Sequence, residues 1–306
     1  PAMKKQGYDT SFSVAITACS SVMGVIIPPS ILMIVWGGLM SVSIGGLFLA
    51  GVVPGFLMAL FMMTTVFIYA KIRNYPIYQR ASLNEFIQAV GRAVFALVTP
   101  AIIVGGIIMG FFTPTEASVV AVIYSAILGG LIYRKIDFNG FRKVLYESAS
   151  LASISLFCIG TASAFGWLLA YYRVPQELVN VLAGFGTGPI ATGFIIALAF
   201  LGIGMFIDAI PAIIILGTIL LPLATKAGIH PIHFAIIGVI SLAFGLVTPP
   251  YGLCLLISCS LGKIKMVHAI KDVAIILIPM FILLVLVILF PDMILFLPRW
   301  LAPNFL

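Results

Sequence analysis

Charged residues are scarce in this sequence. Asp, Glu, Lys and Arg make up 8% of the 306 residues, whereas 62% of the residues are hydrophobic. A soluble domain is nearer half apolar and a quarter charged, so a water-soluble fold of this length could not bury so much apolar surface. This scarcity excludes that class and predicts an integral membrane protein whose apolar segments face lipid.

Cysteines and histidines are also few, with four cysteines and three histidines. The cysteines lie in apolar runs away from histidines, which is typical of small buried side chains rather than of zinc ligands or disulfides. The histidines, His230, His233 and His268, fall in predicted loops near the membrane faces. The sequence also contains no serine–histidine–aspartate set and no phosphate-binding motif, so no catalytic or cofactor-binding signature is present.

The net charge is +7, which in a soluble protein would raise the question of a nucleic-acid partner. Here the basic residues lie between apolar segments, where they act as topology signals. We therefore expect a lipid bilayer around this chain and no nucleic acid bound to it.

A helix needs about 20 apolar residues to cross the hydrocarbon core. Uninterrupted candidates for such crossings are residues 47–70, 93–112, 115–133, 148–171 and 273–297. Three more apolar stretches are interrupted: 11–40 at Pro28-Pro29, 232–260 at Pro249-Pro250, and 191–225 around Asp208 and Pro211. Stretches 74–92 and 134–147 carry mixed charge and predict amphipathic arms at the inner face. The predicted fold class is an all-α polytopic membrane protein.

The positions of Lys and Arg predict how these segments are threaded. We place Lys4 and Lys5 inside, alternate the crossings, and treat 191–225 as a re-entrant hairpin that enters and leaves on the outside. All but three of the 16 Lys and Arg then lie inside, as the positive-inside rule requires. The exceptions are Arg173, Lys226 and Arg299. If 191–225 were a single crossing, Lys263, Lys265 and Lys271 would lie outside. The positive-inside rule therefore predicts the hairpin.

A short motif occurs twice at a constant offset, residue 241 against residue 20 and residue 249 against residue 28. The aligned positions are Ser20, Gly24, Pro28 and Pro29 with Ser241, Gly245, Pro249 and Pro250. In the predicted topology the two copies run in opposite directions, which indicates an inverted repeat of the kind that secondary transporters carry. Residues 1–92 would end the first repeat (broken helix 11–40, crossing 47–70 and the inner arm). Residues 93–306 would form the second (crossings in 93–171, hairpin 191–225, broken helix 232–260 and crossing 273–297).

The double prolines predict exposed oxygen ligands. Proline lacks an N–H and frees carbonyls in the preceding turn, and such a break persists in a membrane only inside protein or beside a cavity. Freed carbonyls with a glycine and a Ser or Thr hydroxyl suit a small hard cation. A single break could be a packing kink, but two matching breaks in opposite orientation favour ion sites.

Two acids are further candidates for function. Asp208 is the sole carboxylate of the 191–225 stretch, and an ionisable group inside the membrane is a functional hypothesis by default; capping the second half of the hairpin is its alternative role. Thr113 and Glu116 match a capping box with Pro114 at the first helical position, which explains them without function. An intramembrane enzyme that uses Asp208 and Glu116, or a channel lined by the broken helices, stays open as an alternative.

The sequence resembles a known family over essentially its whole length. The residues that carry the resemblance are Ser20, Ser21, Gly24 and 28–30, 47–51 with 54–55, 105–106 with 112–117, 204–208, 228–231, Gly245 with 248–250 and Gly252, and 290–292 with 297–298. In these motifs the chain is similar to the large membrane subunit of tripartite ATP-independent periplasmic (TRAP) transporters.

This resemblance implies an elevator-type secondary transporter in the bacterial inner (cytoplasmic) membrane. It would take up an organic acid, such as a C4-dicarboxylate or sialic acid, by symport with sodium ions and without any other cofactor. The implied partners are that organic acid, a small four-helix membrane subunit and a periplasmic substrate-binding protein. Family members carry a further scaffold segment and a first hairpin before the point that matches residue 1, so we expect these 306 residues alone not to transport.

The resemblance also implies two sodium sites, each where a hairpin tip meets a broken helix. One would use Gly24, Ile27 and Pro29 with Ser20 and Ser21. The other would use Gly245 and Thr248 with Pro249, together with Gly204 and Asp208 of the hairpin.

Overall fold

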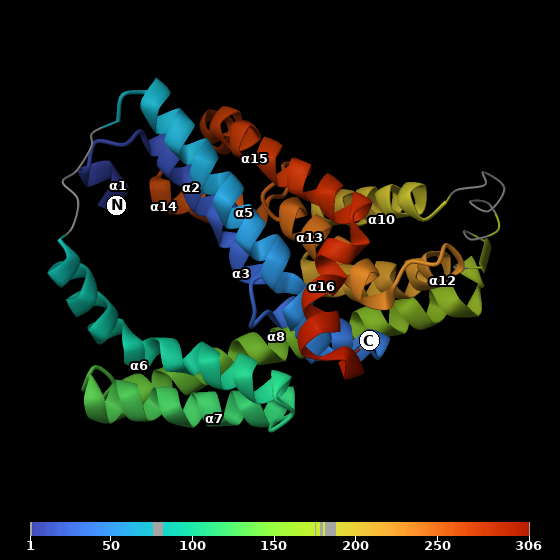
Figure 1. Ribbon diagram of the computed structural model, residues 1–306, viewed down its shortest axis with the longest axis horizontal. Coiled ribbons are helices and arrows are strands. Elements are labelled where there is room, and N and C mark those ends of the chain that lie inside the picture. Colours follow the sequence, from blue (N-terminus) through green and yellow to red (C-terminus); the bar gives the residue numbers. More distant parts are fainter. Residues whose placement is uncertain (1, 76–81, 175, 178–179, 181–187, 306) are drawn as a thin grey trace. The chain divides into compact units, whose positions relative to one another are not determined.

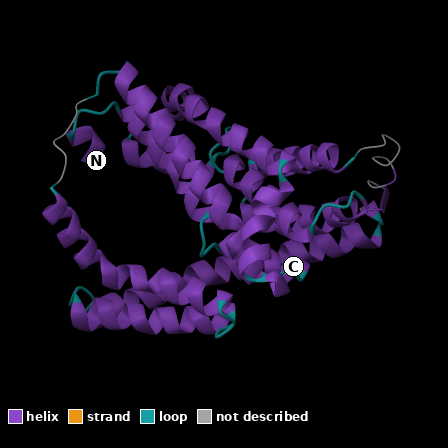
Figure 2. Ribbon diagram, viewed as in Figure 1, coloured by secondary structure: helices purple, strands orange, loops and turns teal. Residues whose placement is uncertain are grey.

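In the computed structural model, every regular element of the described residues is helical (Figure 2). The structure describes residues 2–75, 82–174, 176–177, 180 and 188–305, so the predicted inner arginine Arg80 lies outside the description. The chain forms two compact units, Pro1–Pro76 with Ile159–Leu306, and Ile77–Cys158. Within the described residues, six helices are long and apolar enough to cross a membrane, and a bent pair could supply a seventh.

Most predicted crossings correspond to helices. The crossing at 47–70 is α5 (Ile44–Ile72), and that at 115–133 is α7 (Pro114–Ile127) continued by the π-helical η1 (Leu128–Ile132). The crossing at 93–112 is the second half of α6 (Leu83–Ile108), which bends by 54° between Gly91 and Ala93. The first half of α6 corresponds to part of the amphipathic arm predicted at 74–92.

Two predicted boundaries differ from the structure. The arm predicted at 134–147 is no separate element, because α8 (Phe138–Tyr171) runs unbroken through it into the crossing. The crossing predicted at 273–297 is α15 (Met266–Leu289), and Pro291 begins a second helix, α16 (Pro291–Leu301). Proline at the first helical position needs no N–H partner but cannot continue a preceding helix, so the apolar run is divided there.

The larger unit is built around α13 (Pro231–Gly245), which is labelled in Figure 1. The residues of this helix from Ile232 to Gly245 are all buried. It packs against α5, α15 and α10 (Pro189–Gly204). Trp36 is fully buried beside Phe200 and Phe234. Gly238 makes room for it, since a Cβ there would collide with the indole. This aromatic packing fixes α10 and α13 side by side.

The stretch predicted as a hairpin consists of two helical arms. The first arm is α10; after a turn at 205–208, the second runs through α11 (Ala209–Ala212), the π-helical η2 (Ile213–Gly217) and α12 (Thr218–Lys226). The arms pack together and run in opposite directions (Figure 1). This arrangement agrees with a hairpin, and its re-entrant placement in the membrane stays a prediction.

Both predicted breaks are present. The first separates α2 (Thr10–Ser21) and the single turn α3 (Met23–Ile26) from α4 (Ile31–Met40). The second separates α13 from α14 (Leu253–Gly262). The Pro28–Pro29 and Pro249–Pro250 peptide bonds are cis. The chain enters this unit through α1 (Ala2–Lys5) and ends in the 3-10 helix η3 (Pro303–Phe305), where the Phe305 ring packs against Gly45.

The smaller unit contains α6, α7, η1 and the beginning of α8. A capping box starts α6, in which Ser82 accepts from the Glu85 N–H and Glu85 accepts from the Ser82 N–H. The α6 and α7 helices pack together, and the Tyr124 hydroxyl donates to the Phe95 carbonyl at 2.9 Å.

Candidate functional site

The hairpin tip touches the second helix break directly. α10 ends at Gly204 and α13 ends at Gly245, and a Cβ on Gly245 would lie 2.6–2.9 Å from three backbone atoms of Gly204. A Cβ on Gly204 would in turn lie 3.2 Å from the Leu242 carbonyl oxygen. Two glycines at these positions therefore let two helix ends meet backbone to backbone, which any side chain would prevent.

A hydrogen bond between main chains joins the same two elements. The Tyr251 N–H, in the loop after the double proline, donates to the Met205 carbonyl at the hairpin tip at 3.1 Å. Gly252 follows with φ +47, a left-handed conformation that glycine adopts readily. The carbonyl oxygens of Val247 and Thr248 lie 3.3 Å from where a Gly252 Cβ would be. The loop thus gathers backbone oxygens beside the tip of the hairpin.

Thr248 and Pro249 lie in this loop and are half-buried. The Thr248 hydroxyl donates to the Phe244 carbonyl at 2.8 Å, which leaves the lone pairs of Oγ1 available to a cation. Asp208 is exposed at the N-cap position of the second arm, but its side chain makes no capping hydrogen bond. The structure thus brings Gly204, Gly245 and Thr248 together and places Asp208 at the same hairpin tip.

The residues predicted around the first break lie along one stretch of α2 and α3. The hydroxyls of Ser20 and Ser21 donate to carbonyls of their own helix, Thr17 at 3.3 Å and Ala18 at 2.7 Å. Ser20, Ser21, Gly24 and Ile27 are exposed, and Pro29 is half-buried. No described atom comes within 4 Å of a Cβ built on Gly24. In this respect Gly24 differs from Gly245, its counterpart in the predicted inverted repeat.

Neighbouring residues hold the first break in place. The Ser30 hydroxyl donates to the Val25 carbonyl at 2.5 Å and accepts from the Met33 N–H at 3.3 Å, so it bridges the break and caps α4. On α5, a Cβ at Gly51 would lie 2.7 Å from the Ile26 carbonyl oxygen, and one at Gly55 would lie 2.6 Å from Ile27 Cγ1. These two glycines let the break lie directly on α5.

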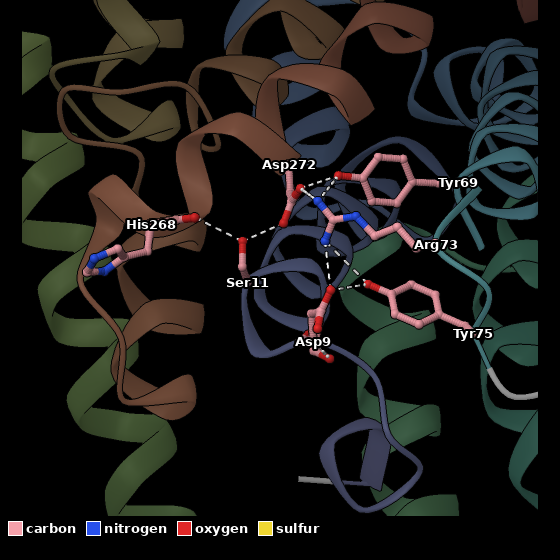
Figure 3. Close-up of polar contacts among 8 residues, drawn as sticks. Asp9, Ser11, Tyr69, Arg73, Tyr75, His268 and Asp272 are labelled. Carbon is pink, nitrogen blue, oxygen red and sulfur yellow. Dashed lines mark hydrogen bonds and ion pairs between the residues drawn. The ribbon is translucent and has the colours of Figure 1, made fainter. Parts of the chain in front are cut away.

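A polar cluster that the sequence did not predict lies at another end of these helices (Figure 3). Asp272 of α15 is 3% exposed and accepts hydrogen bonds from Ser11 of α2 and from Tyr69 and Arg73 at the end of α5. The Arg73–Asp272 ion pair measures 2.8 Å. The cluster ties the beginning of the first broken helix to α5 and α15.

Arg73 also reaches outward from this cluster. Its Nη1 lies 2.8 Å from Asp9, and Tyr75 donates to the same carboxylate at 2.8 Å. The hydrogen bond with Tyr75 and the charge of Asp272 raise the pKa of Arg73. The guanidinium is therefore permanently charged, and it bridges the two carboxylates.

Thr113 and Glu116 form a capping box at the beginning of α7. Glu116 accepts from the Thr113 N–H at 2.8 Å, and the Thr113 hydroxyl accepts from the Glu116 N–H at 3.3 Å. Glu116 belongs to the smaller unit and Asp208 to the larger. A helix-capping role accounts for the contacts of both Thr113 and Glu116.

The expectation that all three histidines lie in loops is wrong for His233 and for His268, which lies in the first turn of α15. His233 makes the more informative contact. His233 lies in α13, is 4% exposed, and its Nε2 is 2.8 Å from the Val287 carbonyl oxygen of α15. His230 is the N-cap of α13, and its Nδ1 accepts from the Ile232 N–H at 3.2 Å. The sequence could not predict this contact, because His233 and Val287 are far apart along the chain.

Comparison with known proteins gives a consistent result. The model of the family described as tripartite ATP-independent periplasmic transporter, DctM component, matches residues 1–293. The sialic acid TRAP transporter large permease protein SiaM of Vibrio cholerae is 33% identical over 97% of this chain and 70% of its own length. The C4-dicarboxylate TRAP transporter large permease protein DctM of Pseudomonas aeruginosa is 35% identical over 99% of this chain and 71% of its own length.

A further relative is the isethionate TRAP transporter permease protein DctMQ of Oleidesulfovibrio alaskensis. It is 38% identical over 87% of this chain, which covers 42% of that relative.

Proposed function

Because the chain belongs to the family of the DctM component of tripartite ATP-independent periplasmic transporters, we propose that it carries a small organic acid across the inner membrane by symport with sodium. The family consists of multi-pass transporter permeases and not of enzymes, so the hypothesis of an enzyme with Asp208 and Glu116 as its acids is set aside. The relatives named for sialic acid and C4-dicarboxylates support a carboxylate substrate.

The observation that carries the proposal is the junction of the hairpin tip with the second break. Gly204 meets Gly245 there, and the Tyr251 N–H binds the Met205 carbonyl. Irregular backbone at membrane depth is tolerated where it lines a cavity or a site, and unwound carbonyls of broken helices coordinate the coupling ion in many secondary transporters. We propose sodium at this junction, held by carbonyls near Gly245 and Pro249 and by the Thr248 hydroxyl, with Asp208 nearby.

The first break supports a second, equivalent site. Under the inverted repeat that we propose, Gly24 corresponds to Gly245, which the hairpin tip covers, whereas no described atom covers Gly24. The sodium ligands there would be Gly24, Ile27 and Pro29 with Ser20 and Ser21, and an elevator movement would carry both sites together.

The proposed partners are a small membrane subunit and a periplasmic substrate-binding protein. The relative described as the isethionate TRAP transporter permease protein DctMQ supports the small membrane subunit, because its name combines an M and a Q component in one permease protein. The exposed apolar side chains of α6, α7 and α8, such as Phe95, Val122 and Phe157, offer a surface for lipid or for that subunit.

The test is transport by the complete natural protein, reconstituted with its small subunit and binding protein in proteoliposomes. Uptake of labelled succinate and sialic acid is measured under an inward sodium gradient and under a matched potassium gradient. We expect saturable uptake of at least one acid with sodium and little with potassium. Sodium-independent uptake that does not saturate would favour a channel and contradict the proposal.

A further inference from the structure

A cavity lies at the beginning of α10 and α13, whereas the junction of Gly204 with Gly245 lies at the end of these two helices. It has a volume of about 520 Å³, within the size range of small-molecule pockets. The residues of its lining that matter here are Pro189, His230, His233, Leu289, Pro291 and Arg299. All of them belong to the larger compact unit, and none is part of the proposed sodium sites.

Three helices present their N-termini to this cavity. Pro189 begins α10 and Pro291 begins α16, while His230 caps α13. These helices have 16, 11 and 15 residues, respectively. A helix N-terminus carries roughly half a positive charge and favours anions. Among the described residues, two helix C-termini oppose them: that of α15 at Leu289, and that of α12, which ends at Lys226 just before the lining residues Gly228 and Ile229. The three N-termini outnumber these two ends, so the backbone still favours a negative ligand in the cavity.

The charged side chain in the lining is also positive. Arg299 donates through Nη1 to Asp292 at 2.6 Å. Within the part of the chain that the structure describes, Nε and Nη2 have no further hydrogen bond, and they can donate in the fork that suits a carboxylate. Asp292 is largely exposed and is absent from the lining. The side chain of Arg299 is 55% exposed, so it can reach a ligand in the mouth of the cavity.

One of the two histidines, His230, adds an N–H donor of fixed orientation. Because His230 Nδ1 accepts from the Ile232 N–H, a neutral His230 carries its hydrogen on Nε2. Burial, and then the charge of Arg299, lower the pKa of His230, so the ring is neutral near pH 7. His233 is held by the Val287 carbonyl and forms part of the wall. The positive charge of the cavity therefore comes from Arg299 and the three helix ends.

Arg299 also stands out in the topology. It is one of three basic residues that the positive-inside arrangement leaves outside, together with Arg173 and Lys226. In the same arrangement the N-terminus of α10 and the loop before α13 lie outside, so the cavity opens at the outer face. The positive-inside rule disfavours a basic residue on the outer side, so we expect Arg299 to have another role there.

We propose that this cavity is an outer binding site for the carboxylate of a small organic acid, which it holds before the acid enters the transport path. Arg299 forms the charge-assisted bond, His230 donates from Nε2, and the helix N-termini supply the positive field. This inference rests on the proposed function for the identity of the ligand, and its test does not require transport.

The test is calorimetric titration of the complete natural protein, in detergent and potassium buffer without sodium, so that the sodium-dependent site does not form. The probes are succinate and N-acetylneuraminate, with uncharged succinamide as the control. Arg299→Gln is compared with Asp292→Asn. A third variant, Arg299→Lys, keeps the positive charge but lacks the paired N–H donors of the guanidinium. Thermal unfolding of each variant is measured alongside to show that it is folded.

We expect wild type to bind at least one acid and not succinamide. Arg299→Gln should weaken binding about tenfold because a charge-assisted hydrogen bond is lost, with Arg299→Lys in between. Asp292→Asn should strengthen binding about threefold, because it removes the carboxylate that competes for Arg299. If Arg299 merely stabilises α16 through Asp292, both variants would weaken binding alike, and that result overturns the proposal. Absence of binding of either acid to wild type also overturns it.

This outcome is separable from that of the proposed function. Opposite shifts for the Arg299 and Asp292 variants without sodium-driven uptake would support the outer site and contradict the symport mechanism. Sodium-driven uptake whose half-saturating acid concentration is the same in both variants would contradict the outer site and leave the transporter intact.

Discussion

Gly245 is the position where the smallest change should have the largest local effect. A Cβ there would lie 2.6 Å from the carbonyl carbon of Gly204, and backbone atoms cannot move aside as a flexible side chain can. We expect Gly245→Ala to push the hairpin tip away from α13 and to lower the free energy of unfolding by about 1–3 kcal/mol. The measurement is thermal or denaturant unfolding of the complete natural protein in detergent.

Gly202→Ala is the matched control for this prediction. It introduces the same methyl group in α10, two residues before Gly204, where a Cβ would meet no atom within 4 Å. The control should be neutral or slightly stabilising, since alanine favours a helix over glycine. Equal effects of the two substitutions would show that the close approach of Gly204 and Gly245 is not required for stability.

Asp272 should contribute more to stability than any exposed carboxylate of the chain. It is 3% exposed and accepts from Ser11, Tyr69 and Arg73. We expect Asp272→Ala to lower the free energy of unfolding by roughly 2–4 kcal/mol, because buried donors lose their acceptor and Arg73 loses its buried partner. Asp292→Ala removes the exposed pair with Arg299 and should cost less than about 1 kcal/mol. Similar losses in the two variants would contradict this assignment.

At the same residue scale, local sequence predicted part of the site and missed the rest. Gly245 and Thr248 could be identified because they stand beside a double proline that occurs twice. Asp272 could not, because its partners lie in α2 and α5, distant in sequence. A lone Asp beside Lys271 is typical of an inner loop, and a tertiary contact is what makes it a buried ion pair.

Among the elements, the hairpin has the sharpest test. Its two arms are α10 and the helix from Ala209 to Lys226. Charge placement predicts that both outer ends, near Gly188 and Lys226, lie on the outside. In a background without the native cysteines, we expect Gly188→Cys and Lys226→Cys to react with an impermeant thiol reagent added outside, and Lys263→Cys to react when it is added inside.

Labelling of Gly188→Cys and Lys226→Cys from opposite sides would make the hairpin a full crossing. That result would also move Lys263 and the basic residues after it to the outside, against the positive-inside rule. The same labelling experiment therefore tests both the hairpin and the orientation of the C-terminal part of the chain.

Element boundaries were predicted less well than element existence, for physical reasons. Apolarity continues from α15 into α16, so composition gives no stop at Leu289, and Pro291 alone divides the run. The charged stretch before residue 148 predicted a separate arm, but nothing in it breaks a helix, and α8 continues through it. Hydropathy predicts which residues can face lipid, whereas proline and capping residues decide where helices end.

At the scale of the whole molecule, the larger unit contains both breaks, the hairpin and the helices that hold them. The α13 helix lies at its centre, in contact with α3, α5, α10 and α15. Such packing favours movement of the broken helices and the hairpin as one body, which the elevator proposal requires. The proposed division into repeats at residue 92 is based on sequence symmetry and stays a prediction. The two compact units divide the chain at other residues and do not test it.

The sodium dependence of uptake in Thr248→Val and Thr248→Ser tests the proposed sodium site at the second break. Uptake is assayed with the small subunit and binding protein in proteoliposomes. Valine keeps the shape of threonine but lacks the hydroxyl, whereas serine keeps the hydroxyl. If the second break binds the coupling ion through Thr248, Thr248→Val should raise the half-saturating sodium concentration about tenfold, as loss of one ligand of roughly 1.4 kcal/mol implies. Thr248→Ser should remain near wild type. Identical sodium dependence in all three proteins would contradict a sodium ligand at Thr248.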